Sequence, residues 1–109
     1  MNIEEILEER GNNYGSFIEH ARVTQNIKRA MQSSKNWLLL SDDKRECMEM
    51  LAHKIGRILN GDPEYIDSWT DIIGYTRLVE RTLEIEDVED ELENYEINYN
   101  NIEEGVQTC

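Results

Sequence analysis

Apolar residues recur every three or four positions through most of the first 83 residues, which is the spacing of amphipathic α-helices. The pattern predicts helices over residues 2–10, 14–31, 42–60 and 63–83, with a loop over 32–41 that ends in an apolar run. We therefore expect an all-α fold, a small bundle of about four helices. The positions of the last helix that are expected to face inward are Tyr65, Ile66, Trp69, Ile72, Ile73, Val79 and Leu83.

Helix boundaries are predicted from capping residues. Gly11, followed by two asparagines, predicts the end of the first helix, and Ser41 is a suitable N-cap for the third. Gly61 fits the left-handed position after a helix, and Asp62 and Pro63 suit the start of the next one. Because this connection is so short, we expect the two helices that it joins to run antiparallel.

The C-terminal part of the chain differs sharply in charge. Residues 84–104 include ten acidic residues, no basic ones and only scattered apolar side chains. Like charges at close spacing resist compaction. We therefore predict a helical domain over residues 1–83 and an acidic extension over 84–109, mostly mobile, in which residues 88–95 form a helix when docked.

The net charge of -13, from 24 acidic and 11 basic residues, opposes binding to nucleic acids or anionic membranes. It is compatible with a divalent cation site, with docking to a basic partner, or with mimicry of nucleic acid. No apolar stretch is long enough to span a bilayer. The two cysteines, Cys47 and Cys109, have no spacing partners, so we expect a reducing compartment, the cytoplasm.

Two pairs of carboxylates are candidates for metal binding. Glu46 and Glu49 are three residues apart in the third helix, and Asp67 and Asp71 are four apart in the last, so each pair shares a helix face. If these faces meet between antiparallel helices, their oxygens form a site for Mg²⁺ or Mn²⁺. The alternative is that both pairs belong to solvated helix surfaces.

Basic and aromatic residues near these carboxylates are candidates for binding a nucleotide. Lys54 and Arg57 follow the glutamates along the third helix, and Tyr75 lies one turn beyond the aspartates. The two cations could bind phosphate oxygens. His20 and His53 have no partner at ligand spacing, and we expect them to be ordinary surface or edge residues.

Three segments carry a resemblance to known proteins: ILEERGNNYGSF, AHKIGRILNGDP and DSWTDIIGYTRLVE. Over residues 3–82 the chain resembles a family of short phage and prophage proteins of unassigned activity. That family looks distantly like the all-α nucleotide pyrophosphohydrolases of the MazG and dimeric dUTPase type, in which ExxE and ExxD motifs bind magnesium. Glu46 and Glu49 match the first motif, whereas Asp67 and Asp71 depart from the second in spacing and in the first residue.

The resemblance implies roles for particular residues. Glu46, Glu49 and Asp71 would be metal ligands, with Asp67 as a fourth, and the two glutamates would also be catalytic. Lys54 and Arg57 would contact phosphate. It further implies a homo-oligomer, with interface residues expected at Trp37, Leu38 and Leu39.

Two classes of function follow. The first is a phage-encoded, MazG-like nucleotide pyrophosphohydrolase that uses a divalent metal and acts in the host cytoplasm. The alternative is a non-catalytic phage protein that sequesters a nucleotide signal, or that binds and inhibits a host defence protein through its acidic surface.

Overall fold

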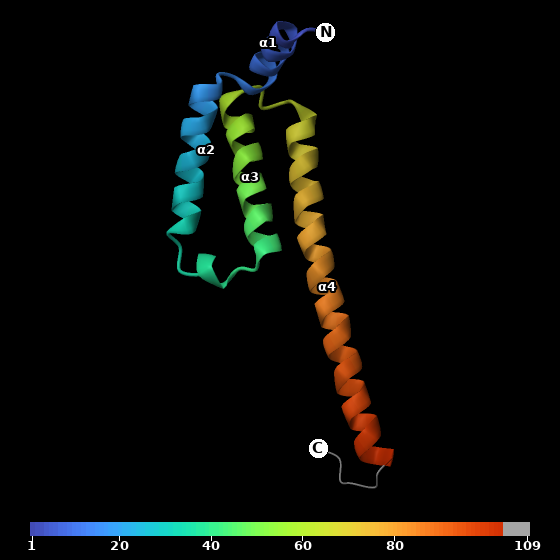
Figure 1. Cartoon of the computed structure of the whole chain (residues 1–109). Coiled ribbons are helices and arrows are strands. Elements are labelled where there is room, and N and C mark those ends of the chain that lie inside the picture. Colours follow the sequence, from blue (N-terminus) through green and yellow to red (C-terminus); the bar gives the residue numbers. More distant parts are fainter. Residues whose placement is uncertain (104–109) are drawn as a thin grey trace. The chain divides into compact units, whose positions relative to one another are not determined.

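The computed structural model describes the backbone of residues 1–103 and the side chains of residues 1–85, 89, 90, 92 and 93. The chain divides into two compact units, Met1–Arg77 and Leu78–Cys109, which are described separately below. Each secondary-structure element in residues 1–103 is a helix, which confirms the all-α prediction (Figure 1). The elements are α1 (Ile3–Tyr14), α2 (Phe17–Gln32), the 3₁₀ helix η1 (Trp37–Leu39), α3 (Asp42–Asn60) and α4 (Ile66–Glu103).

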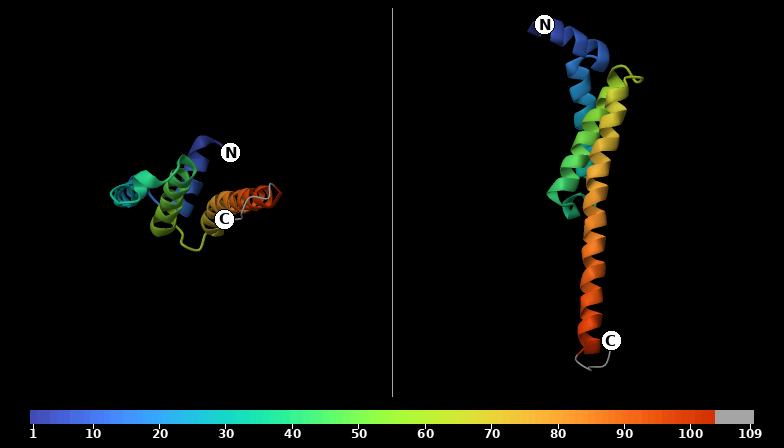
Figure 2. Two further views of the ribbon diagram at one scale, coloured as in Figure 1. Left: turned by 90° about the horizontal axis from the view of Figure 1, so that it is seen from below. Right: turned by 90° about the vertical axis from the view of Figure 1, so that its right-hand side faces the viewer.

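The main helix packing in the first unit is between α2 and α3, which lie side by side and run antiparallel (Figures 1 and 2). Gly56 permits their close approach, because a β-carbon there would collide with the hydroxyl of Thr24 and press against the ring of His20. The helix α1 crosses the end of this pair and contacts both members. This arrangement brings residues of three helices to one end of the unit.

The turn before α2 is held against the end of α3 by side-chain hydrogen bonds. Nδ2 of Asn60 donates to the carbonyl oxygens of Tyr14, at 3.0 Å, and of Ser16, at 2.9 Å. Gly15, between these two residues, has φ +76°, a conformation that favours glycine, and a β-carbon there would collide with the Asn60 carbonyl. Asn60 therefore fixes the path of the turn.

The connection between α3 and α4 meets the same turn through its backbone. The N–H of Asp62 donates to the carbonyl oxygen of Asn13 at 2.7 Å. Gly61 has φ -116°, so the predicted left-handed conformation is wrong. Glycine is needed there for space, because a β-carbon would collide with Asn13 and Tyr14. We call the contacts of residues 13–16 with residues 60–62 the turn lock.

Two predicted helix boundaries are also corrected. The first helix passes through Gly11 and ends at Tyr14, because the chain reverses at Gly15, whose N–H donates to the Gly11 carbonyl. The helix α4 begins at Ile66 rather than at Pro63. Before it, Oδ1 of Asp62 accepts from the N–H of Glu64 at 2.9 Å and closes a turn.

The apolar residues are much less buried than their spacing predicted. Among the described side chains, Cys47 and Ala52 are the buried apolar ones, and no large side chain is completely enclosed. Ile66, Trp69 and Ile73, predicted to face inward, are 70%, 51% and 68% exposed. The prediction was wrong because α4 carries apolar residues on more than one face, and its buried side includes a polar residue, Ser68.

The apolar run of the loop was also misplaced. We expected it to fold back onto the core, but Leu38 and Leu39 are exposed, while Trp37 and Leu40 are half-buried. Arg45 fixes this segment by donating from its guanidinium group to the carbonyl oxygens of Trp37 and Leu38.

The second unit, Leu78–Cys109, contains the C-terminal part of α4, which continues to Glu103. The helix predicted for residues 88–95 therefore extends in both directions. The rest of the predicted acidic extension, residues 104–109, lies outside the described residues. In the described part of the chain no helix combines the length and apolar content needed to cross a membrane.

Candidate functional site

The structure gives the predicted carboxylates different partners. Asp71 of α4 lies next to α3, and its Oδ2 atom is 2.8 Å from Nζ of Lys54. Glu49 accepts a hydrogen bond from Gln32 of α2, at 3.4 Å, and Glu46 is exposed.

Lys54, the partner of Asp71, is eight residues beyond Glu46 on α3, which corresponds to about 12 Å along a helix axis. Among the side chains that the structure describes, no three histidine, cysteine, aspartate or glutamate residues could hold a metal ion together. The site for Mg²⁺ or Mn²⁺ stays a prediction.

The other predicted residues of α4 lie in different surroundings. Asp67 is exposed, and its carboxylate raises the pKa of the Tyr65 phenol by accepting its hydrogen bond. Tyr75 is half-buried, one turn beyond Asp71 in the direction away from Asp67. Lys54 is buried and engaged by Asp71, so its charge is already balanced. Arg57, another of the predicted nucleotide-binding residues, lines two cavities.

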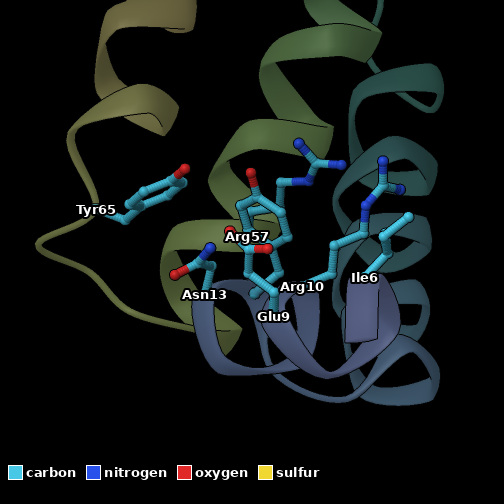
Figure 3. Close-up of a pocket in the computed structure, with 7 residues that line it drawn as sticks. Ile6, Glu9, Arg10, Asn13, Arg57 and Tyr65 are labelled. Carbon is cyan, nitrogen blue, oxygen red and sulfur yellow. The ribbon is translucent and has the colours of Figure 1, made fainter. Parts of the chain in front are cut away.

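A polar cavity of about 250 Å³ opens beside Arg57 at the end of the unit where α1 crosses α3. In Figure 3 the guanidinium groups of Arg57, from α3, and Arg10, from α1, extend on the same side of the ribbon, with Tyr65 across from them. The lining residues are Ile6, Glu9, Arg10, Asn13, Tyr14, Arg57 and Tyr65. Residues far apart in the sequence, from Ile6 to Tyr65, thus line one cavity.

Aromatic rings position the arginine. Cζ of Arg57 lies 4.1 Å from the centre of the Tyr14 ring, a cation–π contact. Tyr14 in turn meets Tyr65 edge to face, with ring centres 5.8 Å apart. The turn lock fixes Tyr14 at this place through its carbonyl oxygen. The guanidinium group is therefore held by ring contacts that leave its N–H donors for other partners.

A second cavity, of about 570 Å³, shares Arg10, Tyr14 and Arg57 with the first. Its other lining residues are Leu7, Gly11, Gly15, Ser16, Phe17, His20 and His53. The shared residues thus line both a polar cavity and a cavity with leucine, phenylalanine and imidazole walls. We call the two cavities together the arginine site.

Two histidines form the inner wall of the larger cavity. Nε2 of His20 lies 3.4 Å from Nδ1 of His53, and the same nitrogen lies 3.4 Å from the hydroxyl of Thr24. The rings meet edge to face. His20 is buried, so the prediction of an ordinary surface or edge residue is wrong for it.

Both imidazoles are kept neutral by their surroundings. Burial lowers the pKa of His53 to about 4, and the positive charge of Arg57 adds to this effect. Burial also lowers the pKa of His20, and the nearby Gly56 backbone partly offsets the effect. At neutral pH the positive charge of the arginine site therefore comes from its two arginines.

These arginines have no ion-pair partner in the described part of the chain. Ion pairs there include those of Glu19 with Arg22, Asp43 with Lys44 and Lys54 with Asp71. Glu9 lines the polar cavity but lies beyond ion-pair distance of Arg10 and Arg57. Two guanidinium groups beside a cavity provide forked donors that match phosphate oxygens.

Compared with models of known protein families, with curated proteins and with solved structures, the chain has no match.

Three residues of the site, Arg10, Tyr14 and Tyr65, were not among the predicted ones. The signal available in the sequence was the segment ERGNNYG, where an arginine precedes two glycines and a tyrosine. We interpreted these glycines as turn residues, and Gly15 is one. The turn residues Tyr14, Gly15 and Ser16 also line the larger cavity of the site.

Proposed function

We propose that this protein binds a nucleotide at the arginine site, as the non-catalytic alternative from the sequence describes. One observation carries the proposal: in a chain of net charge -13, Arg10 and Arg57 line one cavity, and neither lies within ion-pair distance of Glu9, the acidic residue in its lining. Phosphate groups would bind the guanidinium donors, and the rings of Tyr14 and Tyr65 offer surfaces for a base.

The test is the affinity for a panel of nucleotides, measured by isothermal titration calorimetry on the full chain. Replacing Arg57 with alanine removes one charge-assisted contact, and we expect binding to weaken by about 10- to 100-fold. The matched control is Arg29→Ala, since Arg29 is an exposed arginine on α2 whose partner is Asn26. Equal effects of the two substitutions, or no binding of any nucleotide, would refute the proposal.

Metal-dependent hydrolysis is a second candidate. Its support is the resemblance, together with the position of Asp71 on the side of α4 that faces α3. In this structure the positive charge beside Asp71 is that of Lys54. Pyrophosphate release from the same nucleotides, with magnesium or manganese and with chelator, tests it. Release that disappears with chelator and in Glu49→Ala and Asp71→Ala variants would establish the enzyme.

Docking to a host protein is the remaining proposal. It rests on charge: Leu78–Cys109 contains 11 acidic residues and one basic residue, a net charge of -10. Such a segment attracts a basic surface over a distance that salt shortens. If the protein binds a host partner, raising the salt from about 0.05 to about 0.5 M should weaken the complex strongly. A complex that is insensitive to salt would refute docking through this segment.

A further inference from the structure

The larger cavity of the arginine site has the room for the body of a ligand. Its volume of about 570 Å³ lies within the range of about 300–1,000 Å³ that is typical of small-molecule pockets. The polar cavity, at about 250 Å³, lies below this range. Because Arg10 and Arg57 line both cavities, phosphates that they bind can have the attached nucleoside in the larger one.

The lining of the larger cavity combines aromatic rings with neutral polar groups. Phe17 lines it and is 80% exposed, and Tyr14 lines it as well. Aromatic side chains stack on bases of every kind, so these rings would hold a base without choosing it. A choice between bases requires hydrogen bonds, and the imidazoles of His20 and His53 are polar groups of this lining that carry no charge at neutral pH.

The proton of the neutral His20 ring belongs on Nδ1. This nitrogen lies beside Gly56, and burial lowers the pKa of His20 whereas the Gly56 backbone raises it. A backbone group that raises the pKa of an imidazole is an acceptor, so the group is the Gly56 carbonyl oxygen. Nδ1 is enclosed and makes no hydrogen bond of normal geometry. A proton there would still face an oxygen, whereas a bare nitrogen would turn its lone pair toward it.

The Thr24 hydroxyl supports the same assignment. Thr24 is buried, and its hydroxyl lies 3.4 Å from Nε2 of His20. If Nε2 carries no proton, both this hydroxyl and Nδ1 of His53 can donate to it. If Nε2 carried the proton, the buried hydroxyl would lose this acceptor. The first arrangement satisfies more of the buried donors, which is the rule in protein interiors.

This assignment determines the proton of His53. Its Nδ1 donates to Nε2 of His20, so in the neutral ring Nε2 of His53 carries no proton and is a hydrogen-bond acceptor. No described residue makes a hydrogen bond to this second nitrogen. Since the His53 ring is half-buried and lines the larger cavity, Nε2 is the nitrogen that it can offer to a ligand.

We propose that Nε2 of His53 selects the base of the bound nucleotide, favouring the amino bases adenine and cytosine over their oxo counterparts hypoxanthine and uracil. An amino group can donate to this nitrogen, whereas an oxo group at the same position presents a second acceptor to it. To donate from its ring N–H instead, an oxo base would have to move within the cavity. This inference rests on the proposed binding of a nucleotide at the arginine site.

The position of the proton can be measured directly on the unaltered, ligand-free chain. Long-range ¹H–¹⁵N NMR of the full chain, labelled with ¹⁵N-histidine and kept at neutral pH, distinguishes the protonated nitrogen of each imidazole from the bare one. We expect the proton on Nδ1 in both His20 and His53. A proton on Nε2 of His53 would overturn the inference and leave the proposed nucleotide binding untouched.

The preference itself is measured by isothermal titration calorimetry with AMP against IMP and with CMP against UMP. Each amino nucleotide should bind at least about tenfold more tightly than its oxo counterpart, because the exchange removes a hydrogen bond and leaves an acceptor unpaired. His53→Gln should bring the ratio close to one, since its amide can present either an oxygen or an amino group. Arg57→Ala is the control, which should weaken both members of a pair alike and preserve the ratio.

The outcomes separate this inference from the function on which it rests. Equal affinities within each pair, or a ratio that His53→Gln leaves unchanged, would overturn the base preference while nucleotide binding stands. No binding of any of these nucleotides would refute the proposed function itself. Far-ultraviolet circular dichroism shows whether His53→Gln keeps the helical content of the unaltered chain, and the NMR measurement needs no substitution, so it decides the matter even if that variant unfolds.

Discussion

The two units of the chain differ in the origin of their order. Met1–Arg77 contains ten of the 11 basic residues and contacts between distant segments, such as the turn lock and the ion pair of Lys54 with Asp71. Leu78–Cys109 contains one basic residue and contributes a stretch of a single helix. The fold of the first unit therefore depends on tertiary contacts, whereas the helicity of the second depends on the charges along one helix.

This difference separates the chemistry that each unit can perform. A cavity with two convergent arginines requires segments from several helices to be held in place, and the first unit provides them. A helix rich in carboxylates provides a charged surface. The proposed ligand binding would therefore belong to the first unit, and the proposed attraction of a basic partner to the second.

The largest expected effect concerns the turn lock. Gly15→Ala would place a β-carbon against the Asn60 carbonyl at a φ of +76°, so we expect the free energy of unfolding to fall by at least about 2 kcal/mol. Gly11→Ala is the control, because Gly11 has open space around it and lies within α1, where alanine is favoured by up to about 1 kcal/mol. Urea denaturation measures both.

If the first unit depends on tertiary contacts, the two substitutions should act in opposite directions. A similar small effect from both would mean that the turn lock contributes little to stability.

A smaller effect is expected from pH, through His53. Its pKa is about 4 in the folded chain and about 6.5 when unfolded. Between these values the unfolded chain binds a proton that the folded chain does not, so the free energy of unfolding should fall as the pH drops from 6.5 to 4. Above pH 6.5 this contribution is fully present. Thermal denaturation across this range measures it.

The control for this prediction is His53→Gln, which keeps a polar side chain but cannot titrate. The dependence on pH between 6.5 and 4 should become weaker in this variant. An unchanged dependence would assign the effect to other groups.

The smallest expected effect concerns salt and the second unit. Several acidic residues in 84–93 are three or four positions apart, and each like-charged pair costs roughly 0.2–0.5 kcal/mol on a helix. Raising the ionic strength should therefore increase the helical circular dichroism of the full chain by a few per cent through this segment. Glu89→Gln, which removes one such charge, should reduce the increase. A decrease in helicity with salt would contradict the expectation that charge repulsion limits the helicity of the second unit.

Much of the fold could be predicted from local patterns. The helix predicted for residues 42–60 has the bounds of α3, because its stripe and its flanking Ser41 and Gly61 are all local signals. The first helix was predicted too short, since a glycine inside a helix resembles one at its end. The orientation of α4 could not be predicted, because apolar residues occupy more than one of its faces and spacing does not distinguish a face that meets the same chain from one that meets another.

The candidate site was predicted only in part. Arg57 was named from its position near the glutamates, and the structure places it in a cavity. Its partners Arg10 and Tyr65 come from segments 47 and eight residues away, and no periodicity relates them to it. The contact of His20 with His53 spans 33 residues and was missed for the same reason. Helix periodicity locates faces, whereas a site depends on how helices cross.

The turn lock also bears on the order in which the chain folds. Its backbone hydrogen bond joins Asn13 to Asp62, which are 49 residues apart, whereas α2 and α3 are joined by a short loop. Closing a long loop costs more entropy than closing a short one, so we expect the pair of α2 and α3 to form first and α1 to dock last. The arginine site then exists only in chains that have completed folding, and a ligand bound there would slow unfolding from the N-terminal end.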